Sequence, residues 1–142
     1  MSVSSFEISY DAEAVDVPQL MELFASAWWA SRRVESDARA MLAGSDIVVA
    51  VLRRPSGRLA GFARVLTDRT YFAMILDVIV APGRRGEGVG AMILDAALAH
   101  PWVAGVQSVE LVCQPGLVDF YRRWGFTDRV GESRLMRRTV PG

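Results

Sequence analysis

Hydrophobic positions along the chain follow the spacing of helices in some segments and form continuous strand-like runs in others. Helical spacing and end signals predict helices over residues 17–28, 36–43, 88–100 and 117–124. Apolar runs bounded by turn residues predict strands over residues 47–53, 58–66, 71–80, 108–113 and 134–139. The pattern therefore predicts a mixed α and β chain with a strand-loop-helix-strand unit at its centre.

The run 71–80 carries a single charge, Asp77, and is followed by Pro82 and Gly83. Such an apolar run is typical of a central strand covered on both faces. No repeat, low-complexity tract or linker interrupts the pattern, so residues 1–142 are expected to form a single domain.

Composition narrows the partners that the chain can have. Sixteen basic residues balance sixteen acidic ones, which argues against nucleic acid as a partner, because binding a polyanion needs surplus positive charge. One cysteine and one histidine supply no ligand set for zinc, so no metal is expected. No signal peptide and no membrane-spanning run are seen, and the expectation is a cytoplasmic protein without membrane contact.

The most informative segment is the loop from Arg84 to Gly90, which holds three alternating glycines between the central strand and a helix start. Backbone N–H groups there can approach an anion closely, and a helix N-terminus favours phosphate. A dinucleotide fingerprint, Gly86-x-Gly88-x-x-Ala91, matches formally, but five residues separate Gly86 from the preceding strand and too little chain follows. A nucleotide P-loop is excluded because no Gly-Lys-Ser/Thr follows, and a merely connecting turn stays open.

The loop contains the pattern Arg85-x-x-Gly88-x-Gly90, and a second motif, Tyr121-x-x-x-Gly125-Phe126, follows near the C-terminus. The first has the Gln/Arg-x-x-Gly-x-Gly/Ala pattern of the GCN5-related N-acetyltransferases (GNAT), and the second resembles that family's C-terminal Tyr-x-x-x-Gly-Phe segment. The resemblance implies an α/β (α+β) fold. Its central sheet would be mixed, mostly antiparallel, with six to seven strands, flanked by about four helices and splayed at the cofactor-binding strand.

The resemblance also implies an activity, the transfer of an acetyl group from acetyl-CoA to a primary amine by direct attack in a ternary complex. The acceptor would be a small-molecule amine or the amino group of a peptide, and the protein a monomer or homodimer. The alternative is a non-catalytic acyl-CoA-binding regulatory domain. Within the family the chain resembles small bacterial members related to plastid acetyltransferases, some of which act on arylalkylamines such as serotonin, but that substrate is not carried over.

The site residues follow from the same resemblance. The pantetheine arm of the cofactor would pair with the backbone of the central strand at Val78, Ile79 and Val80. Its pyrophosphate would bind backbone N–H groups of the loop, namely those of Arg85, Gly86, Glu87, Gly88, Val89, Gly90 and Ala91.

Three side chains are candidates for the chemistry and the acceptor. Tyr121 matches the family's general acid, and its phenol would protonate the departing thiolate. Asp77 either accepts the amine's proton, directly or through water, or is a structural carboxylate. Trp29 lies off the apolar stripe of the first helix and could line the acceptor pocket or be a packing residue, whereas Trp28 continues the stripe and is expected in the core.

Overall fold

The computed structural model describes residues 5–140 of the 142-residue chain. Contacts between residues divide the chain into two compact units, residues 1–111 and residues 112–142. Each unit is described separately below.

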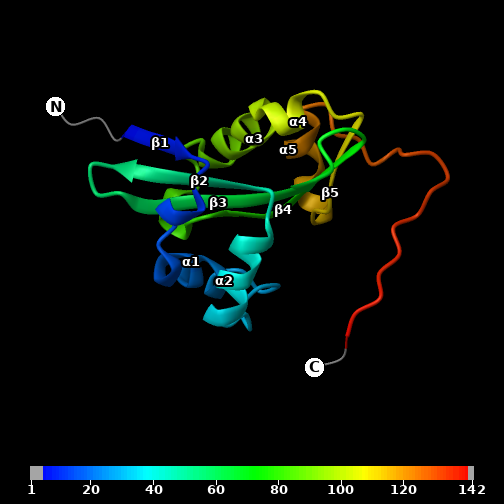
Figure 1. Cartoon of the computed structure of the whole chain (residues 1–142). Helices are drawn as coiled ribbons and strands as arrows, with labels where there is room; N and C mark the ends of the chain where they lie inside the picture. Colours follow the sequence, from blue (N-terminus) through cyan, green and yellow to red (C-terminus); the bar gives the residue numbers. More distant parts are fainter. Residues whose placement is uncertain (1–4, 141–142) are drawn as a thin grey trace. The chain divides into compact units, whose positions relative to one another are not determined.

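The first unit is built on one five-stranded sheet (Figure 1). Its strands, in both chain and spatial order, are β1 (Ser5–Ser9), β2 (Ile47–Arg54), β3 (Arg58–Thr67), β4 (Phe72–Val80) and β5 (Ser108–Leu111). Strands β1 to β4 pair antiparallel, with short turns joining β2 to β3 and β3 to β4, whereas β5 pairs parallel to β4 after a helical crossover. The sheet is therefore mixed and mostly antiparallel, as the family resemblance implied.

Helices cover both faces of this sheet (Figure 1). The chain forms α1 (Val17–Ala25) and α2 (Glu35–Gly44) on one face, α3 (Val89–Ala99) and α4 (Pro101–Ala104) on the other, and α5 (Val118–Arg122) in the second unit. The start of α1 confirms its sequence signal, because the Asp16 carboxylate accepts a hydrogen bond from the Gln19 N–H at 3.0 Å. Pro101 both ends α3 and opens α4, so the described chain has five α-helices where about four were predicted.

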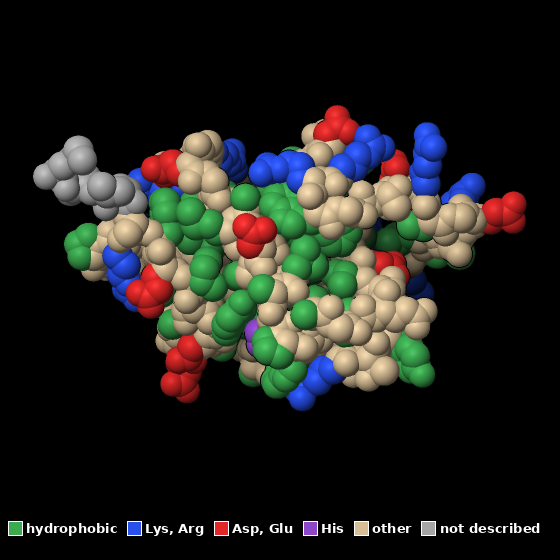
Figure 2. All heavy atoms as spheres, turned by 90° about the horizontal axis from the view of Figure 1, so that it is seen from above, with side chains coloured by type: hydrophobic (Ala, Val, Ile, Leu, Met, Phe, Trp, Pro, Cys, Tyr) green, Lys and Arg blue, Asp and Glu red, His purple; other side chains and the backbone are tan. Residues whose placement is uncertain are grey.

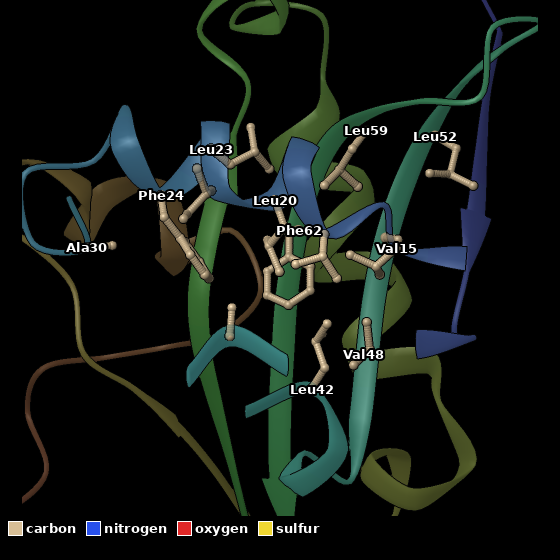
Figure 3. Close-up of a cluster of buried hydrophobic side chains, with 14 residues drawn as sticks. Val15, Leu20, Leu23, Phe24, Ala30, Leu42, Val48, Leu52, Leu59 and Phe62 are labelled. Atoms are coloured by element: carbon tan, nitrogen blue, oxygen red, sulfur yellow. The ribbon is translucent and has the colours of Figure 1, made fainter. Parts of the chain in front are cut away.

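The main core lies between the sheet and the α1–α2 pair (Figure 3). Leu20 and Phe24 of α1 and Leu42 of α2 point toward Phe62 of β3, and the rings of Phe24 and Phe62 meet edge to face with centroids 6.4 Å apart. This packing holds α1, and therefore the chain that follows it, against the middle of the sheet.

The opposite face packs against α3 through a close approach to Gly61 of β3. A Cβ atom at Gly61 would lie 2.6 Å from Cγ1 of Val89, so only glycine lets the first turn of α3 lie this near the sheet. Figure 2 looks down on this side and shows hydrophobic side chains gathered in its middle, with the chain's one histidine, His100, in purple. The glycine-rich loop before α3 is thus attached to a helix start that is fixed by packing.

Three features of the sheet differ from the sequence prediction. The prediction of six to seven strands is wrong, since the described residues form five. Residues 134–139, predicted as a strand, have no strand structure, and Met136 is 92% exposed. A strand exists only with a paired neighbour, which local composition does not supply. In contrast, β1 was not predicted, because its five residues alternate too briefly to be recognised, yet it pairs with β2 throughout.

Candidate active site

The central strand β4 has an unpaired edge along its second half. Pairing between β4 and β5 ends at Ile75 and Leu111, whereas pairing between β4 and β3 continues to Val80 and Gly61. Within residues 5–140, no strand pairs with Leu76–Val80 on the β5 side. The predicted cofactor residues Val78, Ile79 and Val80 lie in this segment, where backbone groups can pair with an extended ligand as with another strand.

A β-bulge interrupts the pairing of β3 and β4 at the start of this segment. The register shifts between the pairs Phe62–Ile79 and Arg64–Leu76, so two residues of β4, Asp77 and Val78, face Ala63 alone. Asp77 adopts a left-handed backbone with φ 58°. Aspartate tolerates this conformation better than most side chains, but it still costs about 1–2 kcal/mol. The bulge redirects the Asp77 side chain relative to a regular strand.

Two arginines bind the Asp77 carboxylate, which is only 6% exposed. Arg33 donates from Nη1 to Oδ2 at 2.7 Å and from Nη2 to Oδ1 at 3.1 Å. Arg64, on β3, donates from Nε to Oδ2 at 2.8 Å. Burial alone would raise the pKa of Asp77, but the hydrogen bonds and charges of both guanidinium groups outweigh it and hold the pKa below its usual value.

Neither arginine was identified from the sequence. Arg64 left a signal, because it is a basic residue inside the otherwise apolar run 59–66, which forms the strand next to the one that holds Asp77. Arg33 left none, because it lies in the irregular connection between α1 and α2 and is 44 residues from Asp77 in the chain.

The connection between α1 and α2 also carries both candidate tryptophans. Trp29 is 41% exposed, and its ring centroid lies 5.4 Å from the guanidinium carbon of Arg33. The prediction that Trp28 is a core residue is wrong, since it is 76% exposed. The helix α1 ends at Ala25, so helical spacing no longer applies where Trp28 lies.

The glycine-rich loop follows the unpaired segment of β4. A 3₁₀ turn at Pro82–Arg84 follows β4, and Gly86 and Gly88 then adopt left-handed backbone angles, φ 87° and 82°. No atom lies within 4 Å of where a Cβ would be at either glycine, so the loop is open on that side.

The helix start behind the loop offers free donors. Gly88 is the N-cap of α3 and provides no side chain to cap it. The first hydrogen bond within the helix runs from the Met92 N–H to the Gly88 carbonyl at 3.1 Å, so the preceding N–H groups have no partner within the helix. Open glycine backbone at the N-terminus of an eleven-residue helix fits a pyrophosphate group.

The second unit places Tyr121 on α5. Its side chain is buried, with the rings of Phe120 and Phe126 at centroid distances of 5.1 and 6.2 Å. Burial, with a smaller contribution from Cys113, raises the pKa of Tyr121 to about 12. The phenol is therefore neutral and able to donate a hydrogen bond across the physiological range.

The described residues hold neither a cluster of metal ligands nor a membrane-spanning helix. No group of three His, Cys, Asp or Glu side chains in residues 5–140 could hold a metal ion. In the same part of the chain, no helix has the length and hydrophobicity needed to cross a membrane.

The chain is similar to proteins already known. An uncharacterized N-acetyltransferase, ycf52, of Porphyra purpurea is 28% identical over 79% of this chain, and the chloroplastic serotonin N-acetyltransferase 2 of Oryza sativa subsp. japonica is 31% identical over 89%. The chain spans 65% and 64% of the lengths of these two relatives.

A structural neighbour and a family model agree with these relatives. A crystal structure from Xanthomonas campestris pv. campestris, assigned to the GNAT acetyltransferases, superposes with a TM-score of 0.85 and 29% identity, covering 97% of this chain and 95% of that one. The model of the acetyltransferase (GNAT) domain matches residues 43–128, which include β4, the glycine-rich loop and Tyr121. This chain therefore belongs to the GNAT family of acetyltransferases.

Proposed function

We propose that residues 1–142 act as one acetyl-CoA-dependent N-acetyltransferase domain whose acceptor is a primary amine, on a small molecule or a peptide. One observation carries the proposal: the unpaired edge of β4 leads directly into an open glycine-rich loop at the N-terminus of α3. A ligand that carries an extended, amide-bearing arm next to a diphosphate can pair its arm with the edge of β4 and bind its diphosphate at the loop.

The backbone is the main cofactor-binding element in this proposal. Peptide groups of Val78, Ile79 and Val80 pair with the pantetheine arm, and N–H groups of the loop bind the pyrophosphate. The loop residues are Arg85, Gly86, Glu87, Gly88, Val89, Gly90 and Ala91. Acetyl-CoA supplies an acetyl thioester, on which the amine forms the C–N bond as the C–S bond breaks.

Tyr121 serves the leaving group chiefly as a hydrogen-bond donor. With a pKa of about 12, its phenol is a weaker acid than a thiol, whose ordinary pKa is near 8.5. Complete proton transfer to the thiolate is therefore uphill by roughly 3.5 pKa units, or about 5 kcal/mol. A hydrogen bond to the developing thiolate has no such cost, and the proton can come from water afterwards.

Asp77 is better suited to positioning than to proton transfer. Its carboxylate accepts three hydrogen bonds from Arg33 and Arg64, and its lowered pKa makes it a weak base. These contacts favour the structural alternative for Asp77, with the amine's proton leaving through water. Trp29, partly exposed beside Arg33, contributes a wall for the acceptor.

Activity is tested by incubating the purified chain with acetyl-CoA and a panel of amines. The panel holds arylalkylamines, diamines, amino acids and peptides, with released thiol measured and acetylated product identified by mass. Cofactor binding without turnover on any amine would instead support the regulatory alternative.

The phosphate site is tested with Gly88→Asp, which puts an anion beside the proposed pyrophosphate and should abolish acetyl-CoA binding. Gly131→Asp is the matched control, because Gly131 has the same left-handed backbone, φ 80°, and equally open surroundings outside the loop. Equal acetyl-CoA affinity in the two variants would show that the pyrophosphate binds elsewhere.

A further inference from the structure

The cluster of charged side chains around Asp77 of β4 is not neutral. It joins two guanidinium groups, those of Arg33 and Arg64, to the single carboxylate of Asp77. The low pKa of Asp77 keeps that carboxylate ionised at neutral pH. The cluster therefore has a net charge of one positive unit, in surroundings where charge is poorly screened.

Arg33 presents this charge outward from a fixed position. Its side chain is 32% exposed, compared with 17% for Arg64. Its guanidinium carbon lies 4.7 Å from the ring centroid of Phe24 and 5.4 Å from that of Trp29, so two aromatic rings and Asp77 together hold it.

Arg33 has hydrogen-bonding capacity left over. A guanidinium has five N–H donors, and Arg33 uses two of them on Asp77, the one hydrogen-bond partner of its side chain among residues 5–140. The remaining donors suit a second planar anion, because the guanidinium fork matches the geometry of a carboxylate.

The cluster lies where the acceptor amine must arrive. In the proposed function, the pyrophosphate binds after β4 ends and the pantetheine arm runs back along Val78–Val80. The thioester end of the arm therefore lies toward Asp77, which directly precedes that segment. An amine that reaches the thioester meets Arg33, paired with Asp77, and the exposed Trp29 beside it.

We propose that Arg33 determines acceptor specificity by binding a carboxylate on the acceptor, so that the preferred acceptors are amino-acid-like primary amines. This inference rests on the proposed N-acetyltransferase activity. The fixed positive charge attracts an acceptor carboxylate and repels a second ammonium group, which disfavours diamines and polyamines. The body of the acceptor packs against Trp29.

The test compares acceptors that differ only by a carboxylate: tryptophan with tryptamine, phenylalanine with phenethylamine, and lysine with cadaverine. In at least one pair, the wild type should favour the carboxylate-bearing amine by tenfold or more in kcat/KM, as expected for a charged hydrogen bond. Arg33→Gln should remove that preference through a higher KM for the carboxylate-bearing amine. Arg33→Lys should restore part of the preference, because it returns the charge without the fork.

Arg32→Gln is the matched control, because it removes the same charge one residue away. Arg32 is exposed and makes no ion pair within the described residues, so this variant should behave as wild type. Inhibition of wild type by 3-indolepropionate, which has the carboxylate but no amine, tests the same contact without any variant. It should be competitive with the acceptor amine, and a lack of inhibition at millimolar concentration would contradict the proposal.

The possible failures are distinguishable. If every pair favours the amine without a carboxylate, or if Arg33→Gln lowers kcat/KM equally for both members, the inference about Arg33 is overturned and the acetyltransferase function stands. If no amine in any pair is acetylated, the proposed function fails, and the inference about the acceptor fails with it.

Discussion

Substituting Gly61 with alanine tests how closely α3 is packed against the sheet. The added Cβ would lie 2.6 Å from Cγ1 of Val89, 3.0 Å from Cδ1 of Ile93 and 3.4 Å from the carbonyl oxygen of Ile79. Favourable carbon contacts are about 3.5–4.0 Å, so the Val89 methyl group must retreat by about 1 Å. Val89 and Ile93 are both buried, and a helical valine has essentially one side-chain rotamer, so the first turn of α3 must move.

The expected cost follows from these overlaps. Overpacking of this kind destabilises proteins by about 1–3 kcal/mol, and the lower chain entropy of alanine in the unfolded state returns about 0.4–1 kcal/mol. A net loss of about 1–2 kcal/mol corresponds to a fall in Tm of about 3–8 °C for a chain of this length. The KM for acetyl-CoA should also rise, because Val89 directly follows Gly88 of the proposed pyrophosphate site.

Thermal unfolding and acetyl-CoA kinetics measure the two effects. Gly44→Ala is the control, because Gly44 ends α2 with nothing within 4 Å of its Cβ position, and alanine there should be neutral or stabilising by up to about 1 kcal/mol. An unchanged Tm in Gly61→Ala, with Gly44→Ala behaving as stated, would refute the close packing of α3 on β3.

Three further predictions concern ionisable groups. Asp77→Asn leaves two guanidinium groups facing a neutral amide. Because the Arg33 side chain is about one-third exposed, solvent screens part of this effect, and we expect the free energy of unfolding, measured in guanidinium chloride at pH 7, to fall by about 2–3 kcal/mol. Because the folded pKa of Asp77 is lowered, its stabilisation is present above the unfolded pKa of about 3.9 and disappears as pH falls through the folded pKa. The stability gap between wild type and Asp77→Asn should therefore narrow below about pH 4, and a gap independent of pH would contradict the ion pairs. The raised pKa of Tyr121 gives the opposite pH dependence. Its contribution to stability is present below about pH 10 and is lost as pH rises toward 12, so the free energy of unfolding should fall less with rising pH in Tyr121→Phe than in wild type. Tyr121→Phe should also lower kcat with little change in acetyl-CoA KM, whereas Tyr71→Phe, at an exposed tyrosine, should change neither.

Local patterns in the sequence were sufficient for most elements that position the site. The start of α1 at Val17, the bounds of β2 and β3 to within one residue, and the break after Val80 all agree with the structure. These features depend on caps, turn residues and apolar runs, whose energetics are decided by neighbours in the chain. The glycine-rich loop was recognised for the same reason, since its function resides in backbone that glycine leaves open.

The errors occurred where a local pattern is not supported by backbone hydrogen bonding. Residues 134–139 have strand-like composition but no paired neighbour, and Trp28 continues a helical spacing after its helix has ended. In both cases composition or periodicity was extended past the point where hydrogen bonding supports it.

Asp77 shows most clearly which properties the sequence determined and which only the tertiary structure decided. The sequence alone established that one charge interrupts an apolar central strand, which marks a site but leaves both the base and the structural carboxylate open. Tertiary structure decided its surroundings: a bulge turns the side chain, β3 brings Arg64, and the connection after α1 brings Arg33 from 44 residues away. The pKa of a carboxyl group depends on charges within a few ångströms, and only the folded chain determines which charges those are.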